Sequence, residues 1–181
     1  SKEASENHPT IPKEIYGTMK LSGEIVTKGL CNFLDIPYSI IRPSAVYGPT
    51  DMNMRVSQIF MEKALSKERL KIHGADEYLD FTFVKDLAMG IVLATTKENS
   101  TSETFNITYG KSHSLLDYVK CLEKIVGKLD YEIVERDKFR PRRGTLSIDK
   151  AKKILGYKPA YDLEKGISEY FEFLTSKTSK D

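Results

Sequence analysis

Tyr16 and Lys20 lie four residues apart, and together they could do acid–base chemistry. On a helix, residues with this spacing share a face, which would place a phenol beside an ammonium group. A free tyrosine has a pKa of about 10 and is a poor base at neutral pH, but a nearby positive charge favours its phenolate form. Such a phenolate can take the proton of an alcohol while a hydride leaves the same carbon. The spacing alone is weak evidence, because a half-buried tyrosine beside a solvated lysine has the same pattern.

A helix must position this pair, and the sequence predicts one that starts just after Pro12. Glycines inside it weaken its propensity, but apolar residues recur at helical spacing. These apolar positions are Ile15, Met19, Val26, Leu30 and Phe33. A buried strand is expected next, at residues 37–42, followed by a loop that continues to residue 49.

Helices and strands alternate along the rest of the chain. Helices are expected at residues 56–65, 87–95, 115–126, 149–155 and 163–174, and extended segments at 70–73, 78–84, 104–108 and 131–135. Ser114 is a good N-cap and Gly127 a good C-terminal stop for the helix between them. We expect residues 175–181 to fray. The alternation indicates the α/β class.

The composition argues against several classes of protein. The chain has 181 residues, of which 40% are hydrophobic and 30% charged, which is typical of one soluble globular domain. Its formal net charge of +2 gives no reason to expect nucleic acid or a membrane surface as a partner. No stretch approaches the ~20 apolar residues of a membrane span, and we see no N-terminal secretory signal.

The cysteines and histidines do not have the spacing of a metal site. Cys31 and Cys121 are isolated, and we expect free thiols in a reducing cytoplasm. The histidines His8, His73 and His113 have no neighbour at metal-ligand spacing. We therefore expect a cytoplasmic protein without a metal ion.

Several ordered motifs carry a resemblance to a known family. They are YGTMK at 16–20, PYSIIRPSAVYGP at 37–49, LKIHG at 70–74, DFTFVKD at 80–86, FNI at 105–107, SIDKA at 147–151, LGYKP at 155–159 and LEKG at 163–166. In this order and spacing they resemble the extended short-chain dehydrogenase/reductase family, from about Glu14 to about Leu174. That family includes nucleotide-sugar 4-epimerases, 4,6-dehydratases and UDP-glucuronate decarboxylases.

The resemblance implies an α/β fold in two parts. Residues 1–50 would be the C-terminal part of a Rossmann-type parallel sheet domain that binds NAD. Residues 51–181 would form a small α/β substrate-binding domain, interleaved with it because residues 84–110 return to the Rossmann-type domain. Family members commonly dimerise through a helix bundle that includes the tyrosine-bearing helix, so a homodimer is expected at full length.

The resemblance also implies roles at the cofactor. Tyr16 is similar to the family's catalytic acid/base, and Lys20 to the lysine that holds the nicotinamide ribose and promotes ionisation of the tyrosine. Pro43 and Ser44 sit where the family's loop approaches the nicotinamide. The implied cofactor is NAD, with NADP not excluded. We expect Tyr47, in the same wall, to pack in the core.

The implied substrate is a nucleotide sugar, and its candidate contacts are mostly basic. Arg55 resembles a residue that borders the pocket, where a planar guanidinium would suit a diphosphate; a solvated helix terminus is the alternative. Arg142 or Arg143 is similar to the arginine that the family keeps for the diphosphate. His73 could stack on the nucleobase, although we favour an ordinary strand-end histidine. We expect Asp86 to be a structural partner and not a catalytic group.

Two departures from the family pattern affect these expectations. Leu79 occupies a position where many relatives carry an arginine that grips the diphosphate. The glycine-rich turn that dinucleotide-binding folds need for the pyrophosphate does not occur in the sequence. We therefore expect a fragment, with an exposed apolar surface near Ile40, Ile41 and Val46. A missing N-terminal half, a second chain or self-association would cover that surface.

The resemblance thus predicts an enzyme at full length, with the isolated chain inactive. It would be an NAD-dependent sugar-nucleotide epimerase/dehydratase that oxidises and re-reduces C4 of a nucleotide-activated hexose. We favour a 4-epimerase, because no glutamate of the kind that 4,6-dehydratases use stands beside Tyr16. The alternative is a catalytically inactive sugar-nucleotide-binding or scaffolding module of the same fold. A nucleic-acid module would rest only on the basic cluster at 136–143, and the low net charge argues against it.

Overall fold

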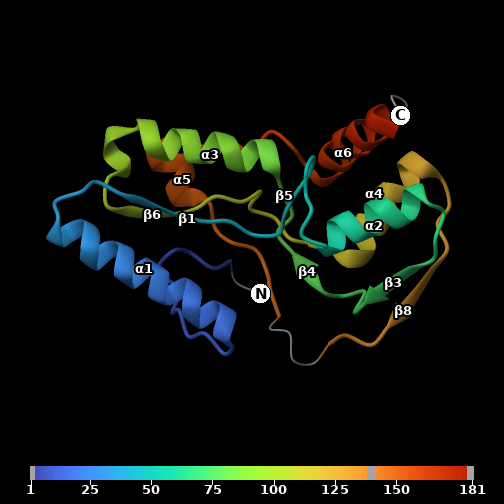
Figure 1. Cartoon of the computed structure of the whole chain (residues 1–181), viewed down its shortest axis with the longest axis horizontal. Helices are drawn as coiled ribbons and strands as arrows, with labels where there is room; N and C mark the ends of the chain where they lie inside the picture. The colour runs from blue at the N-terminus through green and yellow to red at the C-terminus, as the bar shows by residue number, and fades with distance from the viewer. Residues whose placement is uncertain (1–2, 138–141, 179–181) are drawn as a thin grey trace.

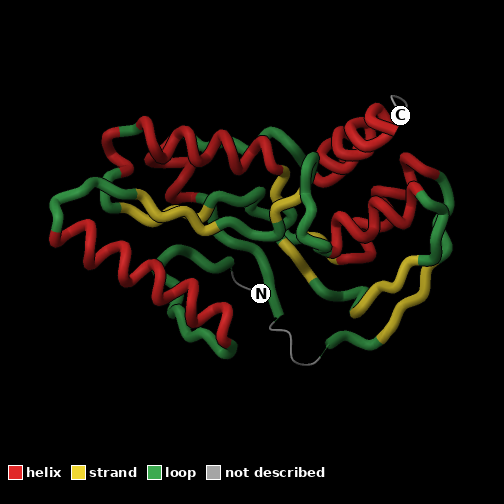
Figure 2. The backbone as a smooth tube through the Cα atoms, viewed as in Figure 1, coloured by secondary structure: helices red, strands yellow, loops and turns green. Residues whose placement is uncertain are grey.

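The computed structural model describes residues 3–137 and 142–178. Helices and strands alternate along the chain, as Figure 2 shows, and the strands of the described residues form four two-stranded sheets. All but one of these strand pairs are parallel. Parallel pairs need long crossover connections, usually helices, so the α/β class predicted from the alternating pattern is confirmed.

Strands β1 (Ser39–Arg42) and β6 (Glu103–Asn106) pair in parallel at the centre of the first lobe. Helices α3 (Val84–Thr96) and α5 (Asp149–Leu155) lie on one face of this pair (Figure 1). Helix α1 (Ile15–Phe33) lies along the other face. The first lobe therefore has three layers, with the strand pair in the middle.

The second lobe is built on another parallel pair, β3 (Leu70–His73) with β8 (Tyr131–Val134). Helices α2 (Val56–Leu65), α4 (Leu115–Val126) and α6 (Leu163–Thr178) lie together beside this pair (Figure 1). Segments far apart in the sequence thus pack against one another, which gives the lobe its own core.

Two short strand pairs join the lobes. Strand β2 (Val46–Tyr47) pairs in parallel with β5 (Thr82–Phe83), and β4 (Tyr78–Leu79) pairs antiparallel with β7 (His113–Ser114). Figure 1 shows β4 and β5 between the lobes. Because β5 runs directly into α3, the chain re-enters the first lobe there. It passes through a short 3-10 turn, Glu98–Ser100, before β6.

Each lobe has its own hydrophobic cluster. The larger one includes residues of the second lobe and of the strands that join the lobes. The smaller one lies in the first lobe and consists of Ala94, Phe105, Ile107, Ile148, Ala151, Leu155 and Tyr157. Each large buried side chain contributes on the order of 1.5–3 kcal/mol. Residues 148–157 thus pack with the first lobe, although we expected them in the substrate-binding domain.

Tyr47 is a core residue, as expected. Its ring meets those of Phe83 and Tyr118 edge-on, with centroids 5.5 and 6.0 Å apart. Its hydroxyl donates to the carbonyl of Leu163 at 3.4 Å. Helix α6 comes so close at Gly166 that a Cβ atom there would collide with the Tyr47 hydroxyl. Burial raises the pKa of Tyr47 well above its usual range, so this phenol stays neutral.

Helix α4 has the predicted bounds because both of its ends are capped. The Ser114 hydroxyl accepts the N–H of Asp117 at 3.0 Å, and the Asp117 carboxylate accepts the N–H of Ser114 at 2.9 Å. This reciprocal capping box satisfies two otherwise unpaired donors. Gly127 ends the helix with φ of 83°.

Two other helices differ from the prediction. Helix α3 begins at Val84 and not at residue 87, because its first turn contains the polar Lys85 and Asp86 and so hides the apolar period. Helix α6 continues to Thr178, although we expected residues 175–181 to fray. The Thr175 hydroxyl donates to the carbonyl of Phe171 at 3.0 Å, which accommodates a polar residue in a continuing helix.

The apolar residues that predicted α1 face solvent. They are Ile15, Met19, Val26, Leu30 and Phe33, exposed by 79%, 69%, 64%, 54% and 84%. No residue of α1 is buried. We expected the exposed apolar surface near Ile40, Ile41 and Val46, but Ile40 is buried and the other two are half-buried. The surface lies on α1 instead because β6, α3 and α5 already cover β1.

An ion pair attaches α1 to β1. Arg42 donates from Nε to Oε1 of Glu24 at 2.8 Å and from Nη2 to Oε2 at 2.7 Å. The two side chains are 23% and 19% exposed. The side-chain hydrogen bonds hold the pKa of Glu24 below its usual range and that of Arg42 above it. Both groups are therefore charged at neutral pH, in the bidentate geometry that makes such pairs strong.

Asp86 joins α3 to the chain that follows α5. Its buried carboxylate accepts the backbone N–H of Ala160 at 2.8 Å and that of Tyr161 at 3.0 Å. Burial raises the pKa of Asp86, while these hydrogen bonds act in the opposite direction. The two bonds to backbone amides explain its burial, as expected for a structural partner.

Removing the Asp86 carboxylate should destabilise the fold. Asp86→Ala would leave the N–H groups of Ala160 and Tyr161 without this charged acceptor, and we expect the free energy of unfolding to fall by about 2–4 kcal/mol. The measurement is a urea titration followed by circular dichroism. Asp130→Ala is the control, because Asp130 is 74% exposed and its contact with Arg69 is 3.6 Å long. Equal losses in the two variants would contradict this role for Asp86.

Replacing Glu24 with glutamine should lower stability at neutral pH and progressively less in acid. The folded-state pKa of Glu24 lies below its ordinary value of 4.5. Its ion pair therefore contributes fully above that pH, and the contribution is lost as the pH falls through the lower folded-state value. We expect Glu24→Gln to lower the free energy of unfolding by about 1–2 kcal/mol at pH 7.

The same urea titrations, repeated at decreasing pH, check the sign of this effect. Glu164→Gln is the control, since Glu164 and its partner Lys124 are 56% and 60% exposed and such pairs contribute little. A loss for Glu24→Gln that does not shrink below pH 4.5 would show that the charge of Glu24 is not what holds α1.

Candidate functional site

Tyr16 and Lys20 are neighbours in the first turns of α1. The Lys20 ammonium nitrogen lies 5.6 Å from the centroid of the Tyr16 ring, as expected for residues four apart on a helix. Tyr16 is 65% exposed, and Lys20 is exposed as well. Lys20 makes no ion pair within the described part of the chain, so its three N–H donors are available to a ligand.

Glu14 fixes the start of the helix that carries this pair. Its two carboxylate oxygens accept the N–H groups of Tyr16 at 2.9 Å and Gly17 at 2.7 Å. A Cβ atom on residue 17 would lie 2.8 Å from Oε1 of Glu14, so glycine lets the carboxylate close over the turn. Both oxygens of Glu14 are therefore engaged in capping the helix.

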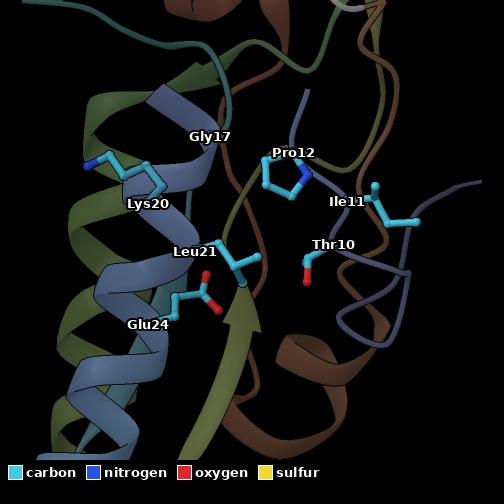
Figure 3. Close-up of a pocket in the computed structure, with 7 residues that line it drawn as sticks. All are labelled: Thr10, Ile11, Pro12, Gly17, Lys20, Leu21 and Glu24. Carbon is cyan, nitrogen blue, oxygen red and sulfur yellow. The ribbon is translucent and has the colours of Figure 1, made fainter. Parts of the chain in front are cut away.

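A groove lies between α1 and the loop that precedes it. Its volume is about 280 Å³, and it is lined by Thr10, Ile11, Pro12, Gly17, Lys20, Leu21 and Glu24 (Figure 3). Figure 3 shows the ammonium of Lys20 extending away from Pro12, on the other side of the helix. The volume is below the roughly 300–1,000 Å³ of typical ligand sites. A groove of this size does not enclose a typical ligand by itself.

Pro43 and Ser44 follow β1 directly, at its carboxyl end. Pro43 is exposed and Ser44 is half-buried. Ala45 comes next with φ of 35°, which is uncommon for a residue with a side chain. Its carbonyl accepts the N–H of Thr82 at 3.2 Å, so strand β5 holds the turn. Open parallel sheets bind ligands at this carboxyl edge, which is where we expected the two residues to act.

Arg55 lies beside the same turn. It is the exposed N-cap residue of α2, and its Nη1 donates to the carbonyl of Val46 at 3.3 Å. The guanidinium thus reaches back toward the segment that follows Ser44. Arg55 is thus an exposed residue at a helix terminus, which was one of the two alternatives, and it also lies next to the 43–46 segment.

The other candidate substrate contacts lie in the second lobe. His73 is exposed at the end of β3. Arg142 makes an ion pair with Asp76, in the turn after β3, at 3.6 Å, and its side chain is 65% exposed. Arg143 is exposed as well. An exposed pair of this length is weak, so Arg142 could exchange Asp76 for an anionic ligand at little cost.

Leu79 cannot supply the positive charge expected at its position, and His113, its cross-strand neighbour, does not supply it either. Leu79 is half-buried and pairs with His113 across β4 and β7. Burial lowers the pKa of His113 below its ordinary value of 6.5, so this imidazole is neutral at pH 7. A diphosphate bound at this point would need positively charged side chains from elsewhere in the site.

Tyr16, Lys20, Pro43 and Ser44 all belong to the first lobe, whereas His73 lies in the second lobe and Arg142 pairs with Asp76 beside it. No hydrogen bond or ion pair among the described residues joins these two sets directly. Sequence reasoning missed Arg42 and Glu24, which connect the end of β1 to the tyrosine-bearing helix. The spacing held a signal for Glu24, because this residue continues the row of Tyr16 and Lys20 by another four positions.

The described residues hold no metal site. Within 3–137 and 142–178, no three His, Cys, Asp or Glu side chains gather as metal ligands would. No helix in those ranges combines the length and the apolar character needed to cross a bilayer. Cys31 and Cys121 are free and half-buried.

The chain is similar to known proteins over most of its length. The model of a family described as the NAD dependent epimerase/dehydratase family matches residues 1–108. An uncharacterized UDP-glucose epimerase of Bacillus subtilis is 30% identical over 176 residues, which is 96% of this chain and 56% of that protein. A putative UDP-glucose 4-epimerase of Methanocaldococcus jannaschii is 32% identical over 178 residues, or 93% of this chain and 56% of that protein.

Solved structures give the same result. UDP-glucuronic acid 4-epimerase from Bacillus cereus, in complex with UDP-glucuronic acid and NAD, has a TM-score of 0.90 and 29% identity, covering 98% of this chain and 57% of that one. UDP-glucose 4-epimerase from Thermotoga maritima, with UDP-glucose, has a TM-score of 0.85 and 29% identity, covering 97% and 58%. The chain thus spans little more than half the length of the relatives it matches.

These matches confirm the resemblance carried by the ordered motifs. They also confirm the expected fold, which is part of a Rossmann-type sheet domain interleaved with a small α/β domain. The matched region contains the Tyr16–Lys20 pair, the turn after β1 and the first-lobe strands. This chain is a member of the NAD dependent epimerase/dehydratase family.

Proposed function

We propose that the protein containing this chain is an NAD-dependent sugar-nucleotide epimerase/dehydratase, and more narrowly a 4-epimerase. The observation that carries the proposal is the exposed Tyr16–Lys20 pair, with 5.6 Å between the lysine nitrogen and the ring centroid. Similar solved proteins include 4-epimerases for UDP-glucuronic acid and for UDP-glucose. The proposed substrate is accordingly a nucleotide-activated hexose.

In this proposal Tyr16 moves a proton and Lys20 supports it. The Tyr16 phenol oxygen takes the proton of the C4 hydroxyl and later returns a proton to the same oxygen. The Lys20 ammonium, 5.6 Å from the centroid of the Tyr16 ring, supports this transfer, and its N–H groups would hold the nicotinamide ribose. NAD, when bound, supplies the hydride acceptor and donor for C4. Inversion at C4 would require the hydride to be returned to the opposite face of that carbon.

The described residues fit the nicotinamide end of such a cofactor. Lys20 has ammonium donors that are not taken by any ion pair in the described ranges. Pro43 and Ser44, at the carboxyl end of β1, offer an apolar surface and a hydroxyl to a flat ring. A dinucleotide pyrophosphate needs a glycine-rich turn, which this sequence does not contain. We therefore assign the nicotinamide end to these residues, with NADP as the alternative to NAD.

The capping role of Glu14 supports epimerisation over dehydration. A dehydratase needs a further acid or base to remove the C5 proton and the C6 hydroxyl. Glu14 is the carboxylate nearest in sequence to Tyr16, and both of its oxygens already accept backbone N–H groups. We infer that the reaction at this site ends with the return of the hydride to C4.

We propose substrate contacts on the opposite side of the site. Arg55 would meet the diphosphate from the N-terminus of α2, where the helix dipole also favours an anion. Arg142 or Arg143 would meet it from the segment beside the turn that follows β3. His73 would lie toward the nucleobase, although an ordinary strand-end histidine accounts for it as well.

We propose that residues 1–50 and 84–110 form the C-terminal part of the NAD-binding domain. Residues 51–83 and 111–181 would form the substrate-binding domain, with 148–157 packed against the NAD-binding part. The glycine-rich half would come from a further segment of the protein or from a second chain. The isolated chain would then be inactive, and the whole enzyme would work in the cytoplasm.

We propose that the whole protein is a homodimer that buries the apolar stripe of α1. This stripe faces away from β1 and consists of Ile15, Met19, Val26, Leu30 and Phe33. Five exposed apolar side chains along one helix are costly in water. A second copy would present the same stripe, so the contact would be isologous.

Removing the Tyr16 hydroxyl should abolish turnover without abolishing cofactor binding. In the whole protein, we expect Tyr16→Phe to lower kcat by about a hundredfold to ten-thousandfold, with bound NAD unchanged. The measurement is conversion of UDP-glucose and UDP-glucuronic acid, together with the NAD content of the purified protein. Tyr78→Phe is the control, because Tyr78 is exposed and lies on β4. Full activity of Tyr16→Phe would exclude Tyr16 as the proton-transfer group. An inactive parent protein that binds the sugar nucleotide would instead favour a binding module.

A charge in the apolar stripe should separate the dimer. We expect Val26→Glu to weaken self-association at least about tenfold in Kd, because a carboxylate would be buried without a partner. Sedimentation velocity measures the change. Asn32→Glu adds the same charge to the same helix outside the stripe and should leave the dimer intact. A Val26→Glu variant that stays dimeric would place the interface elsewhere.

A further inference from the structure

Helix α1 carries the proposed catalytic pair, and within the described residues few contacts attach it to the rest of the first lobe. None of its residues is buried, and its apolar stripe points away from the strand pair. Few buried contacts and exposed backbone hydrogen bonds are the marks of a segment that opens easily. Catalysis needs the reacting groups held to within a fraction of an ångström. Some specific contact must therefore set the position of α1 relative to the end of β1.

Arg42 makes that contact with all of its guanidinium arms. Two arms form the bidentate pair with Glu24. The third, Nη1, donates to the carbonyl of Glu6 at 3.0 Å. A planar fork bonded on three sides has little freedom to rotate. The last residue of β1 is thereby fixed to α1 and to the N-terminal segment at once.

The N-terminal segment extends this network to β6. The Glu6 carboxylate accepts the backbone N–H of Asn106 at 2.8 Å. The Asn106 side chain donates to the carbonyls of Ala4 at 3.1 Å and Ser147 at 3.0 Å. Through Glu6, Arg42 is thus connected to the backbone of β6 as well as to its own strand β1.

The position of the network matches that of the proposed chemistry. Glu24 lies four residues after Lys20 and eight after Tyr16, so the three form one row along α1. On the strand side, Arg42 is followed directly by Pro43 and Ser44. One residue therefore connects the helix that would move the proton to the turn that would approach the nicotinamide.

We infer that Arg42, acting through Glu24, is a positioning residue that sets the Tyr16–Lys20 pair against the turn at Pro43 and Ser44. Arg42 touches neither substrate nor cofactor in this account, which rests on the proposed function. Lysine at position 42 would keep the positive charge but lose the fork. In this account the positive charge alone does not position α1, because the two parallel hydrogen bonds to Glu24 need the planar guanidinium.

The test uses the whole protein with Arg42→Lys, Glu24→Gln and the double variant. We expect each single change to lower kcat per bound NAD by about tenfold to a hundredfold, with KM for the sugar nucleotide within about twofold. The double variant should be no worse than the worse single variant, because both changes break one connection. Arg69→Lys is the matched control, since Arg69 is 56% exposed and its contacts with Asp130 and Glu132 are 3.6 and 3.7 Å long.

Amide hydrogen exchange gives a readout that does not depend on activity. In Arg42→Lys, α1 should exchange about tenfold faster while α4 stays unchanged. Unchanged exchange in α1, additive losses in the double variant, or a rise in KM that accounts for the loss would each overturn the inference. Equal acceleration in α4 would mean general destabilisation and would also overturn it. An inactive parent protein would instead contradict the proposed function, and the exchange comparison would still decide whether Arg42 holds α1.

Discussion

The parallel pairing of β1 with β6 is the interaction on which the rest of the first lobe depends. It gives α3 and α5 a face to cover, and Phe105 of β6 is fully buried in the cluster they form. It also ends at Arg42, whose guanidinium attaches α1 to the opposite face. Apolar packing therefore stabilises the face of the strand pair that α3 and α5 cover, and hydrogen bonds and charge hold α1 on the other face. The candidate site lies on the face with α1.

This division explains why the helix with the proposed catalytic pair has no buried residue. A helix that packed its apolar stripe on β1 would bury Ile15 and Val26, and Tyr16 and Lys20 would then point in another direction. Here the stripe faces outward, where a second copy could cover it, and the polar side of α1 turns to the strands. Glu24 at the strand side and Glu14 at the N-terminus then orient the helix through hydrogen bonds.

Much of the fold follows from local sequence signals. Ser114 and Gly127 bound α4 because capping is decided by the residues at the ends themselves. The start of α3 was misplaced because Lys85 and Asp86 interrupt the apolar period, and their partners lie far along the chain. Asp86 bonds to Ala160 and Tyr161, which no local pattern indicates.

The candidate site was predictable only in part. Tyr16 and Lys20 could be selected by spacing and by the ordered motifs around them. The sequence could not predict that the apolar stripe of α1 faces outward. Periodicity identifies which residues share a helix face, but it does not identify the element against which that face packs. Arg42 and Glu24 were missed for a similar reason, since 18 positions separate the two in the chain and only the fold brings them together.

The central claim is that the hydrogen on C4 leaves as a hydride and returns to the same carbon, while Tyr16 accepts and returns the proton of the C4 hydroxyl. The most direct measurement is incubation of the whole protein with UDP-glucose or UDP-glucuronic acid in deuterated water, followed by NMR of the product. The account predicts inversion at C4 with no deuterium on that carbon. Deuterium at C4, a 4-keto-6-deoxy product, or no conversion of any nucleotide sugar by protein with bound NAD would contradict it.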